Sequence, residues 1–570
     1  MTQQMIATLK DEDQDFEWYP TTAAMAATVS LKLRDIYDCG FSLLDIGAGD
    51  GRVIQMIEEN HKRATAIRWG DNNEREGEGL TGRYAIEKAR PLLNALPDNV
   101  TIVGTDFTEQ TLIDKQADVI FCNPPYSEYG DWMCRILREA NAAHVFMIVP
   151  ARWADNEIIQ DTIRRREIRH EVLQSTDFAD AQRAARARVD IIHFDLTAPE
   201  GERCRRHGHG DGPKVEPFDV WFADYFKVSD AAPTAEQSDY DKEKEGAERI
   251  HQLVRGKNQV TALVELYRAD MDKLIANYQA VCALDTEILR ELNVSVPDLK
   301  KAMKKKIAGL KSLYWKELFS KLAAITDRLT SKSREGMLGM LNKHMGVDFT
   351  EGNIYAVVVW ALKNVNQYLE SQLKDLYLRM TREENVRNFK SNAHMTKDTW
   401  RYCRNYSRQQ DGDFRKSIHH YTLEYRIVLH AYNAIGDNSS WRHNHQGNLA
   451  SEAHEYIGDI LTIANNLGFA STNDSTGRQW ESNQAQVFYC MKPKALTGTP
   501  IMEVRAFKNG NIHIKLDQDF MRAFNVEAAR LFGWIKSPKE AAEEMGCTEG
   551  QAERAFRTNL QITTVPLLSA

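Results

Sequence analysis

The amino-acid sequence predicts a doubly wound α/β sheet at the N-terminus, then a mainly helical region, then a C-terminal α+β domain. An apolar run at residues 42–46 ends in the glycine-rich turn 47–51, and helix-like residues 52–57 follow. Further strand-like apolar runs occupy residues 83–87, 100–105, 117–122, 143–150 and 189–196. A strand, a tight glycine turn and a helix form the repeating unit of parallel sheets, and the glycines let the backbone approach a ligand.

The glycine turn reads Asp45-Ile46-Gly47-Ala48-Gly49-Asp50-Gly51. Its G-x-G-x-G spacing differs from the dinucleotide fingerprint, and no lysine follows as a phosphate loop would require. The turn resembles motif I of the S-adenosylmethionine (SAM) methyltransferases, which have a Rossmann-like sheet. The resemblance implies that Asp45, Gly47 and Gly49 hold the methionine part of SAM.

Two further carboxylates follow predicted strands. Glu87 closes the short strand 83–87, where an acidic residue of nucleotide-binding folds accepts hydrogen bonds from the ribose hydroxyls. The resemblance places Asp106 at the adenine amino group of SAM and Phe107 against the adenine ring. The polar stretch 60–82, which precedes Glu87, is longer than in the compact family pattern.

Residues 18–22 precede a predicted helix and include Tyr19 and Thr21. This segment resembles the one that closes over the SAM carboxylate in methyltransferases whose cofactor motif precedes the catalytic motif. The resemblance therefore adds Tyr19 and Thr21 to the expected cofactor site.

The catalytic candidate is Asn123-Pro124-Pro125-Tyr126, directly after the strand-like run 117–122. Two consecutive prolines fix φ and restrict the residue before them, so the Asn123 carboxamide and the Pro124 carbonyl have fixed directions. Their two oxygens can accept both hydrogens of one NH₂ group, and Tyr126 offers a flat face to a base. The tetrapeptide resembles motif IV of methyltransferases that act on DNA adenine, DNA cytosine, RNA adenine or glutamine side chains, and it places Asn123 beside the cofactor as well.

The two motifs together predict a SAM-dependent N-methyltransferase. Their order, with a large region behind the sheet, resembles the gamma order of DNA adenine methyltransferases, which implies double-stranded DNA with a flipped adenine as substrate. Phe178, predicted to lie in a loop, matches an aromatic that related enzymes present to the base. Three alternatives stay open: an RNA adenine methyltransferase, a protein glutamine methyltransferase, and a non-catalytic DNA-binding protein of the same fold.

The composition indicates an intracellular protein without a metal site. Eight cysteines are scattered singly with no C-x-x-C pair, which is typical of a reducing compartment. There is no apolar run long enough to cross a membrane and no secretory signal, so we expect a cytoplasmic location. No sequence feature indicates an oligomeric state.

The net charge of −8 does not favour nucleic-acid binding, so any basic surface must be local. Candidates are residues 164–169 and 204–212, the arginines at 183, 186 and 188, and a run of seven lysines in residues 299–316. The lysine run also has apolar residues at helical spacing, so an ordinary amphipathic helix is an equal alternative.

The predicted domains are residues 1–228 (methyltransferase), 229–258 (linker), 259–400 (helical) and 401–570 (α+β, with a role in target recognition). Residues 504–516 alternate around Asn509-Gly510, a strong hairpin signal. Residues 538–556 have the rhythm of a helix-turn-helix, or of a two-helix cap that does not touch DNA. The whole chain resembles phage- or mobile-element-borne methyltransferases with an uncharacterised C-terminal domain, which implies a role in DNA modification or restriction evasion.

Overall fold

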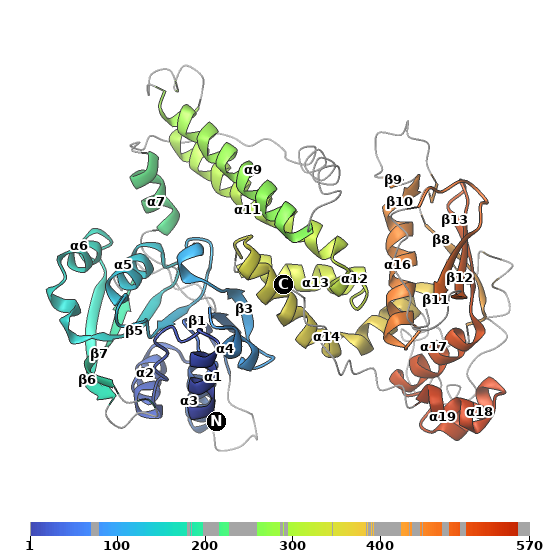
Figure 1. The fold of residues 1–570 in the computed structure, drawn as a ribbon, viewed down its shortest axis with the longest axis horizontal. Coiled ribbons are helices and arrows are strands. Elements are labelled where there is room, and N and C mark those ends of the chain that lie inside the picture. The colour runs from blue at the N-terminus through green and yellow to red at the C-terminus, as the bar shows by residue number, and fades with distance from the viewer. Residues whose placement is uncertain are drawn as a thin grey trace. The chain divides into compact units, whose positions relative to one another are not determined.

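The computed structural model forms two compact units (Figure 1): Met1–Leu318 with Leu338–Trp360, and Phe319–Met337 with Ala361–Ala570. The structure describes residues 2–69, 79–178, 183, 185–197, 216–226, 259–284, 289, 294–344, 346–382, 385, 389, 392, 423–431, 434–435, 445–446, 448–469, 478–490 and 498–556. The predicted linker 229–258 and the basic segment 204–212 lie outside these residues. The helical residues 259–400 do not form a unit of their own, since the two units share them.

The first unit contains a seven-stranded sheet in the order β3-β2-β1-β4-β5-β7-β6. Its strands are β1 Ser42–Ile46, β2 Gly82–Ile86, β3 Thr101–Gly104, β4 Val119–Cys122, β5 His144–Pro150, β6 Arg169–Phe178 and β7 Ala185–Asp195. The strands from β3 to β5 are parallel, and β7 is antiparallel to both β5 and β6. This arrangement confirms the predicted doubly wound, Rossmann-like fold class.

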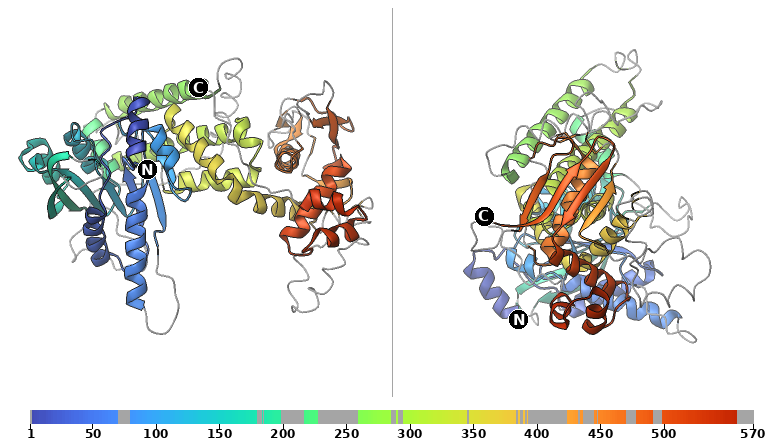
Figure 2. Two further views of the ribbon diagram at one scale, coloured as in Figure 1. Left: turned by 60° about the horizontal axis from the view of Figure 1, so that its bottom comes forward. Right: turned by 90° about the vertical axis from the view of Figure 1, so that its right-hand side faces the viewer.

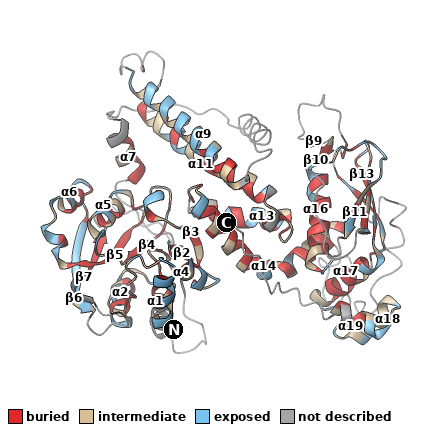
Figure 3. Ribbon diagram, viewed as in Figure 1, coloured by how far each residue is buried: buried red, intermediate tan, exposed pale blue. Residues whose placement is uncertain are grey.

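Helices flank this sheet: α1 Thr2–Asp11, α2 Ala23–Ile36, α3 Arg52–Trp69, α4 Arg90–Ala95, α5 Tyr129–Glu139, α6 Glu157–Arg165 and α7 Pro217–Phe226. Thr22 caps α2 and Asn156 caps α6, each by accepting hydrogen bonds from free backbone amides of the first turn. Every residue of β4 and β5 is buried (Figure 3), as expected for central parallel strands that helices cover on both faces.

Strand β6 was not predicted, because its side chains are mostly exposed and polar and give no continuous apolar run. It pairs with β7, and this pairing corrects the position of Phe178. That residue is the last of β6, opposite Ala185, and does not lie in a loop. The side chain of Phe178 lies outside the described residues, so its predicted contact with a base stays a prediction.

Several arginines that we expected on a basic surface have intramolecular partners. Arg166 is buried, and its Nη1 donates to the carbonyls of Leu137, Arg138 and Ala140 at the end of α5, at 2.8, 3.2 and 3.3 Å. Arg183 forms a 2.7 Å ion pair with Asp15. The prediction of a basic surface is therefore wrong for Arg166, which stabilises a helix C-terminus.

The predicted long helices are confirmed as α9 Gln259–Cys282, α11 Val296–Lys321 and α14 Glu351–Met380; α12 Ala323–Thr326 and α13 Ser331–His344 lie between α11 and α14. The lysine run belongs to α11. Lys311 is buried in ion pairs with Asp114 and Asp348, so this part of the run is structural. None of the helices in the described ranges combines the length and apolar character that a membrane span requires.

The second unit has a four-stranded antiparallel sheet in the order β11-β12-β13-β8, seen in the right-hand view of Figure 2. Its elements are β8 Arg426–His430, β9 His445–Gln446, β10 Leu449–Ala450, α16 Ser451–Asn466, β11 Gln486–Cys490, β12 Thr499–Ala506, β13 Asn511–Leu516, α17 Gln518–Leu531, α18 Pro538–Met545 and α19 Glu549–Phe556. The hairpin around Asn509-Gly510 is confirmed, with Gly510 at φ +85°. Gly546 ends α18 at φ +58°, which confirms the helix-glycine-helix pattern but not a DNA contact.

We expect Arg166→Ala to destabilise the first unit by about 2–4 kcal/mol, because two buried carbonyls and one partly buried carbonyl would lose a charged donor. Arg165→Ala is the matched control. The adjacent Arg165 side chain is 72% exposed and pairs only at the surface with Asp161, so the cost should be under about 0.5 kcal/mol. Thermal unfolding of the full chain measures both, and equal shifts in the midpoint would contradict the assignment.

Candidate active site

The pairing of β1 with β4 brings the glycine turn and the Asn-Pro-Pro corner to the same edge of the sheet. Ile46 lies opposite Cys122 in this parallel pair, so Gly47 and Asn123 both leave the sheet at the next position. A Cβ atom built on Gly47 would lie 3.9 Å from the Asn123 carbonyl oxygen. The two motifs, 78 residues apart in the sequence, are therefore neighbours in space.

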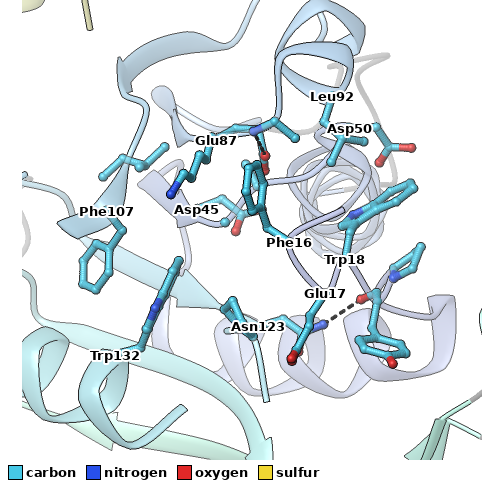
Figure 4. Close-up of a pocket in the computed structure, with 18 of the residues that line it drawn as sticks. Phe16, Glu17, Trp18, Asp45, Asp50, Glu87, Leu92, Phe107, Asn123 and Trp132 are labelled. Carbon is cyan, nitrogen blue, oxygen red and sulfur yellow. Dashed lines mark hydrogen bonds between the residues drawn. The ribbon is translucent and has the colours of Figure 1, made fainter. Parts of the chain in front are cut away.

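A cavity of about 340 Å³ lies at this edge. Its walls are residues 14–21, the glycine turn, the ends of β2, β3 and β4, and the first turn of α5. In Figure 4, Phe107 and Trp132 lie on one side, Trp18 lies on the other, and Asp45 and Glu87 lie between them. Ligands of doubly wound sheets bind at this position, outside the carboxyl ends of the strands.

Most of the predicted site residues line this cavity: Tyr19, Thr21, Asp45, Gly47, Glu87, Asp106, Phe107, Asn123 and Pro125. Three other predicted residues do not line the cavity but directly adjoin residues that do, namely Gly49, Pro124 and Tyr126. Gly49 is at φ +59°, and a Cβ there would clash with the indole nitrogen of Trp18. Glycine is needed at this position both for its backbone conformation and for this close approach.

Asp45 is buried, and no hydrogen bond from a described residue offsets the cost of removing its carboxyl group from water. It is 1% exposed, and neither of its oxygens accepts a hydrogen bond from any residue that the structure describes. Burial, with the nearby Glu87 and Asp50 carboxylates, raises the pKa of Asp45 well above its usual value. A buried acceptor without a donor is costly, so its presence in the cavity wall indicates a ligand that donates hydrogen bonds or carries positive charge.

Glu87 ties the end of β2 to the glycine turn. Its two carboxylate oxygens accept hydrogen bonds from the backbone amides of Gly49 and Ala89, both at 2.7 Å. Burial raises the pKa of Glu87 to about 7, although these backbone hydrogen bonds oppose the shift. A carboxylate oxygen has two lone pairs, so Glu87 keeps free acceptor sites for ligand hydroxyls.

Asp106 and Phe107 form the wall at the end of β3. The Asp106 carboxylate accepts from the backbone amide and hydroxyl of Thr108 at 2.9 and 2.7 Å, and it pairs with Lys88 at 2.7 Å. Phe107 packs against Trp132 with ring centroids 4.4 Å apart. This aromatic pair gives the cavity a flat apolar wall beside a carboxylate, which suits a purine ring with an amino group.

The N-terminal segment fixes the orientation of the Asn123 carboxamide. Its Nδ2 donates to the carbonyl of Tyr19 at 2.9 Å and to the hydroxyl of Thr21 at 3.3 Å. The oxygen Oδ1 accepts from the Tyr126 hydroxyl at 3.3 Å. Because both donors of the amide are directed to the N-terminal segment, Oδ1 is the atom that can accept from a substrate.

Tyr126 is stacked on Tyr19, with ring centroids 5.6 Å apart and planes 3° from parallel. The Arg183 guanidinium lies 4.6 Å from the centroid of the Tyr19 ring. The face of Tyr126 toward Tyr19 is therefore covered. A base that stacks on Tyr126 must use its other face or displace Tyr19.

Two tryptophans of the cavity were not named as site residues from the sequence, although Trp18 belongs to the predicted segment 18–22. Trp18 packs over the glycine turn with Arg52 at 5.4 Å from its ring centroid, and Trp132 lies 3.7 Å from a Cβ built on Gly47. Trp132 lies one turn into α5, on the helix that starts just after the Asn-Pro-Pro-Tyr corner. Its position just after the Asn-Pro-Pro-Tyr corner could have indicated that it lines the site, but a single tryptophan on an amphipathic helix normally indicates core packing.

The strand order and the cavity define the first unit as a Rossmann-like domain with a ligand site at the switch between β1 and β4. Residues 307–534 match the model of a family described as a domain of unknown function, DUF4942. No curated protein matches the chain.

Solved structures match part of the chain at low identity. The 23S rRNA methyltransferase ErmE is 12% identical and covers 46% of this chain and 89% of its own, with a TM-score of 0.24. The E. cuniculi Mtq2-Trm112 complex, which methylates the eRF1 termination factor, is 12% identical, covers 31% of this chain and 97% of its own, and has a TM-score of 0.22. A Geobacter metallireducens precorrin-6y C5,15-methyltransferase is 15% identical, covers 31% of this chain and 94% of its own, and has a TM-score of 0.21. Similarities with TM-scores below 0.5 assign no reaction or substrate to this chain.

We expect Asp45→Asn to stabilise the protein without ligand, because the amide has no charge to desolvate. The pKa of Asp45 is raised well above 3.8 in the folded protein, whereas the unfolded residue ionises near 3.8. Its contribution to stability is therefore complete below that pH and is lost as the pH rises through the folded-state pKa. The advantage of the variant should grow from pH 5 to pH 8, reaching about 2–4 °C in the unfolding midpoint.

Asp50→Asn is the control for this variant. Asp50 lies in the same turn but forms a 2.6 Å ion pair with Arg52, so its loss should lower the midpoint slightly. A stabilisation of Asp45→Asn that does not depend on pH would contradict a titrating carboxyl at this position.

Proposed function

We propose that the protein is a SAM-dependent N-methyltransferase that methylates the 6-amino group of adenine in double-stranded DNA. The observation that carries the proposal is the oriented Asn123 carboxamide: its nitrogen donates to the N-terminal segment, its Oδ1 has a second lone pair besides the one that accepts from Tyr126, and residue 123 lies next to the glycine turn at the edge of the cavity. An acceptor held in this position can bind a planar amino group and draw its lone pair out of conjugation. The biological role we propose is DNA modification or restriction evasion in the cytoplasm.

The cavity walls fit SAM. Phe107 and Trp132 suit the adenine ring, the Asp106 carboxylate suits its amino group, and Glu87 suits the ribose hydroxyls. The orphaned Asp45 carboxylate suits the ammonium of the methionine part, and the glycine turn admits its backbone-sized chain. When bound there, SAM would supply an electrophilic methyl group.

The residues of the chain do little acid–base chemistry in this proposal. Asn123 Oδ1 and the Pro124 carbonyl accept the two amino hydrogens and orient the nitrogen lone pair toward the methyl group. A nitrogen–carbon bond forms as the sulfur–carbon bond breaks, and the extra amino proton then leaves to solvent. The two fixed acceptors stabilise the positive charge that develops on nitrogen in the transition state.

Arg152 favours a nucleic acid over a protein substrate. Its side chain is exposed and lies at the catalytic corner, with Nη2 3.3 Å from the carbonyl oxygen of Tyr126 and its guanidinium 5.1 Å from the centroid of the Tyr129 ring. A cation on the rim of the site suits the phosphate of a flipped nucleotide. An amino group in a glutamine side chain would not need it.

Incubation of the full chain with tritiated SAM and unmodified DNA, RNA or release factor tests the proposal. Label in DNA, recovered as N6-methyl-2′-deoxyadenosine after digestion to nucleosides, is the expected result. Label as methylcytosine, in RNA or in protein would replace DNA adenine with that substrate. Binding of DNA without transfer to any acceptor would favour a non-catalytic protein.

We expect Asn123→Ala to lower kcat by about 10²–10³, because one of two preorganised acceptors is lost in the transition state. Affinity for SAM should change by less than about threefold. Single-turnover rates and calorimetric titration separate the two effects. Asn141→Ala is the control, because that asparagine bonds to the Ile113 carbonyl and does not line the cavity. A parallel fall in rate and cofactor affinity would show that Asn123 mainly holds the cofactor.

We expect Arg152→Ala to weaken DNA binding about equally for all sequences, since a phosphate contact carries no sequence information. The slope of log K against log salt concentration should fall by about one, the signature of one lost phosphate contact. Fluorescence anisotropy at several salt concentrations measures it. Arg165→Ala, an exposed arginine on α6, should leave the slope unchanged, and an equal change in both variants would argue against a specific contact.

A further inference from the structure

The loop that leads from β3 to β4 packs against residues 346–353, which connect α13 to α14 within the first unit. Gly346 N donates to the Asp114 carbonyl at 3.1 Å, and Gly352 allows the start of α14 to approach β3 closely. A Cβ on Gly352 would lie 2.6 Å from the Thr105 hydroxyl. The contact therefore depends on backbone proximity as well as on side chains.

Asn353 is the centre of this contact and is 0% exposed. Its Oδ1 accepts from the Thr105 amide at 2.8 Å, the Thr105 hydroxyl at 3.1 Å and Gln110 Nε2 at 3.0 Å. Its Nδ2 donates to Gln110 Oε1 at 2.9 Å and to the Asp348 carbonyl at 2.8 Å. Both ends of this carboxamide are thus committed to fixed partners.

A buried ionic cluster reinforces the contact. The Asp348 carboxylate accepts from the Thr111 amide at 2.9 Å and pairs with Lys115 at 2.9 Å and Lys311 at 2.7 Å. Lys115 is 0% exposed and Lys311 is 4% exposed. Burial alone would raise the pKa of Asp348, but the two ammonium groups lower it to about 2. The Asp348 carboxylate is therefore ionised at neutral pH.

These contacts lead directly to the cofactor cavity. Thr105, whose amide and hydroxyl bind Asn353, lines the cavity and precedes Asp106. Gln110, paired with Asn353, also donates to the Asp106 carbonyl at 3.1 Å. Asn353 does not line the cavity, so any effect it has on a ligand must pass through residues 105–110.

We infer that Asn353 is a positioning residue of the cofactor site, and that residues 346–353 of the region matched by DUF4942 hold the Asp106 and Phe107 wall in its binding geometry. The inference rests on the proposed function, because it takes SAM as the ligand of this cavity. It assigns a role to the start of a domain whose description gives none. That part of the domain completes the methyltransferase site and does not act as a separate recognition module.

The test compares Asn353→Ala with Asn364→Ala in the full chain, with S-adenosylhomocysteine as the calorimetric probe. Asn364 is a second buried asparagine on α14; it is 5% exposed and belongs to the second unit, whereas Asn353 belongs to the first. We expect Asn353→Ala to raise the Kd about tenfold, whereas kcat at saturating SAM stays within about twofold. Asn364→Ala should leave the Kd unchanged at a similar loss of thermal stability. Gln110→Ala should raise the Kd as well, and adding it to Asn353→Ala should have little further effect.

Hydrogen exchange of the wild-type chain gives a second measurement that no folding defect can affect. Coupling is reciprocal, so S-adenosylhomocysteine should slow amide exchange in residues 346–353, which do not line the cavity. An unchanged Kd in folded Asn353→Ala, or protection confined to the cavity walls, would overturn the inference. Failure of the wild-type chain to bind the probe would instead count against the proposed function.

Discussion

The parallel register of β1 and β4 is the constraint on which the rest of the first unit depends. It places Ile46 beside Cys122, so the glycine turn and the Asn-Pro-Pro corner leave the sheet at one point. A slip in register would separate Gly47 from the Asn123 carbonyl, now 3.9 Å from a Cβ position on that glycine. Buried parallel strands resist such a slip, because every side chain of β4 is packed. The proximity of these two motifs is therefore a consequence of sheet pairing.

Some groups of the site destabilise the folded protein, and the stability of the surrounding fold offsets this cost. Asp45 is buried without a hydrogen-bond donor among the described residues, and Gly47 and Gly49 both adopt positive φ. Tyr19 and Thr21 accept from the donor end of the Asn123 amide, so Oδ1, which also accepts from the Tyr126 hydroxyl, is the end that can bind a ligand. Unsatisfied groups of this kind are typical of binding sites, where a ligand supplies the missing partner.

The sequence predicted the sheet because its parallel strands are continuous apolar runs. Asp45 lies within such a run and Glu87, Asp106 and Asn123 stand at the ends of others, and the resemblance to methyltransferase motifs made these four residues candidates for the site. Strand β6 was missed because it lies at the edge and is polar. The basic surface was wrong at Arg166, because charge in a sequence does not show which groups become buried. Trp18 and Trp132 reach the cavity from the N-terminal segment and from α5, and no local pattern encodes that convergence. The same is true of Asn353, which lies 248 residues from its partner Thr105.

The contact between Asn353 and the loop after β3 is polar, and this is informative. A buried ion cluster such as Asp348 with Lys115 and Lys311 adds little net stability compared with apolar packing, since desolvation offsets the attraction. Directional hydrogen bonds do fix one arrangement, whereas apolar side chains can slide. A contact needed only for cohesion would not require five hydrogen bonds at one carboxamide next to the cavity wall. These directional hydrogen bonds suit a contact that fixes the position of the Asp106 and Phe107 wall, which is what the binding of one flat ligand would require.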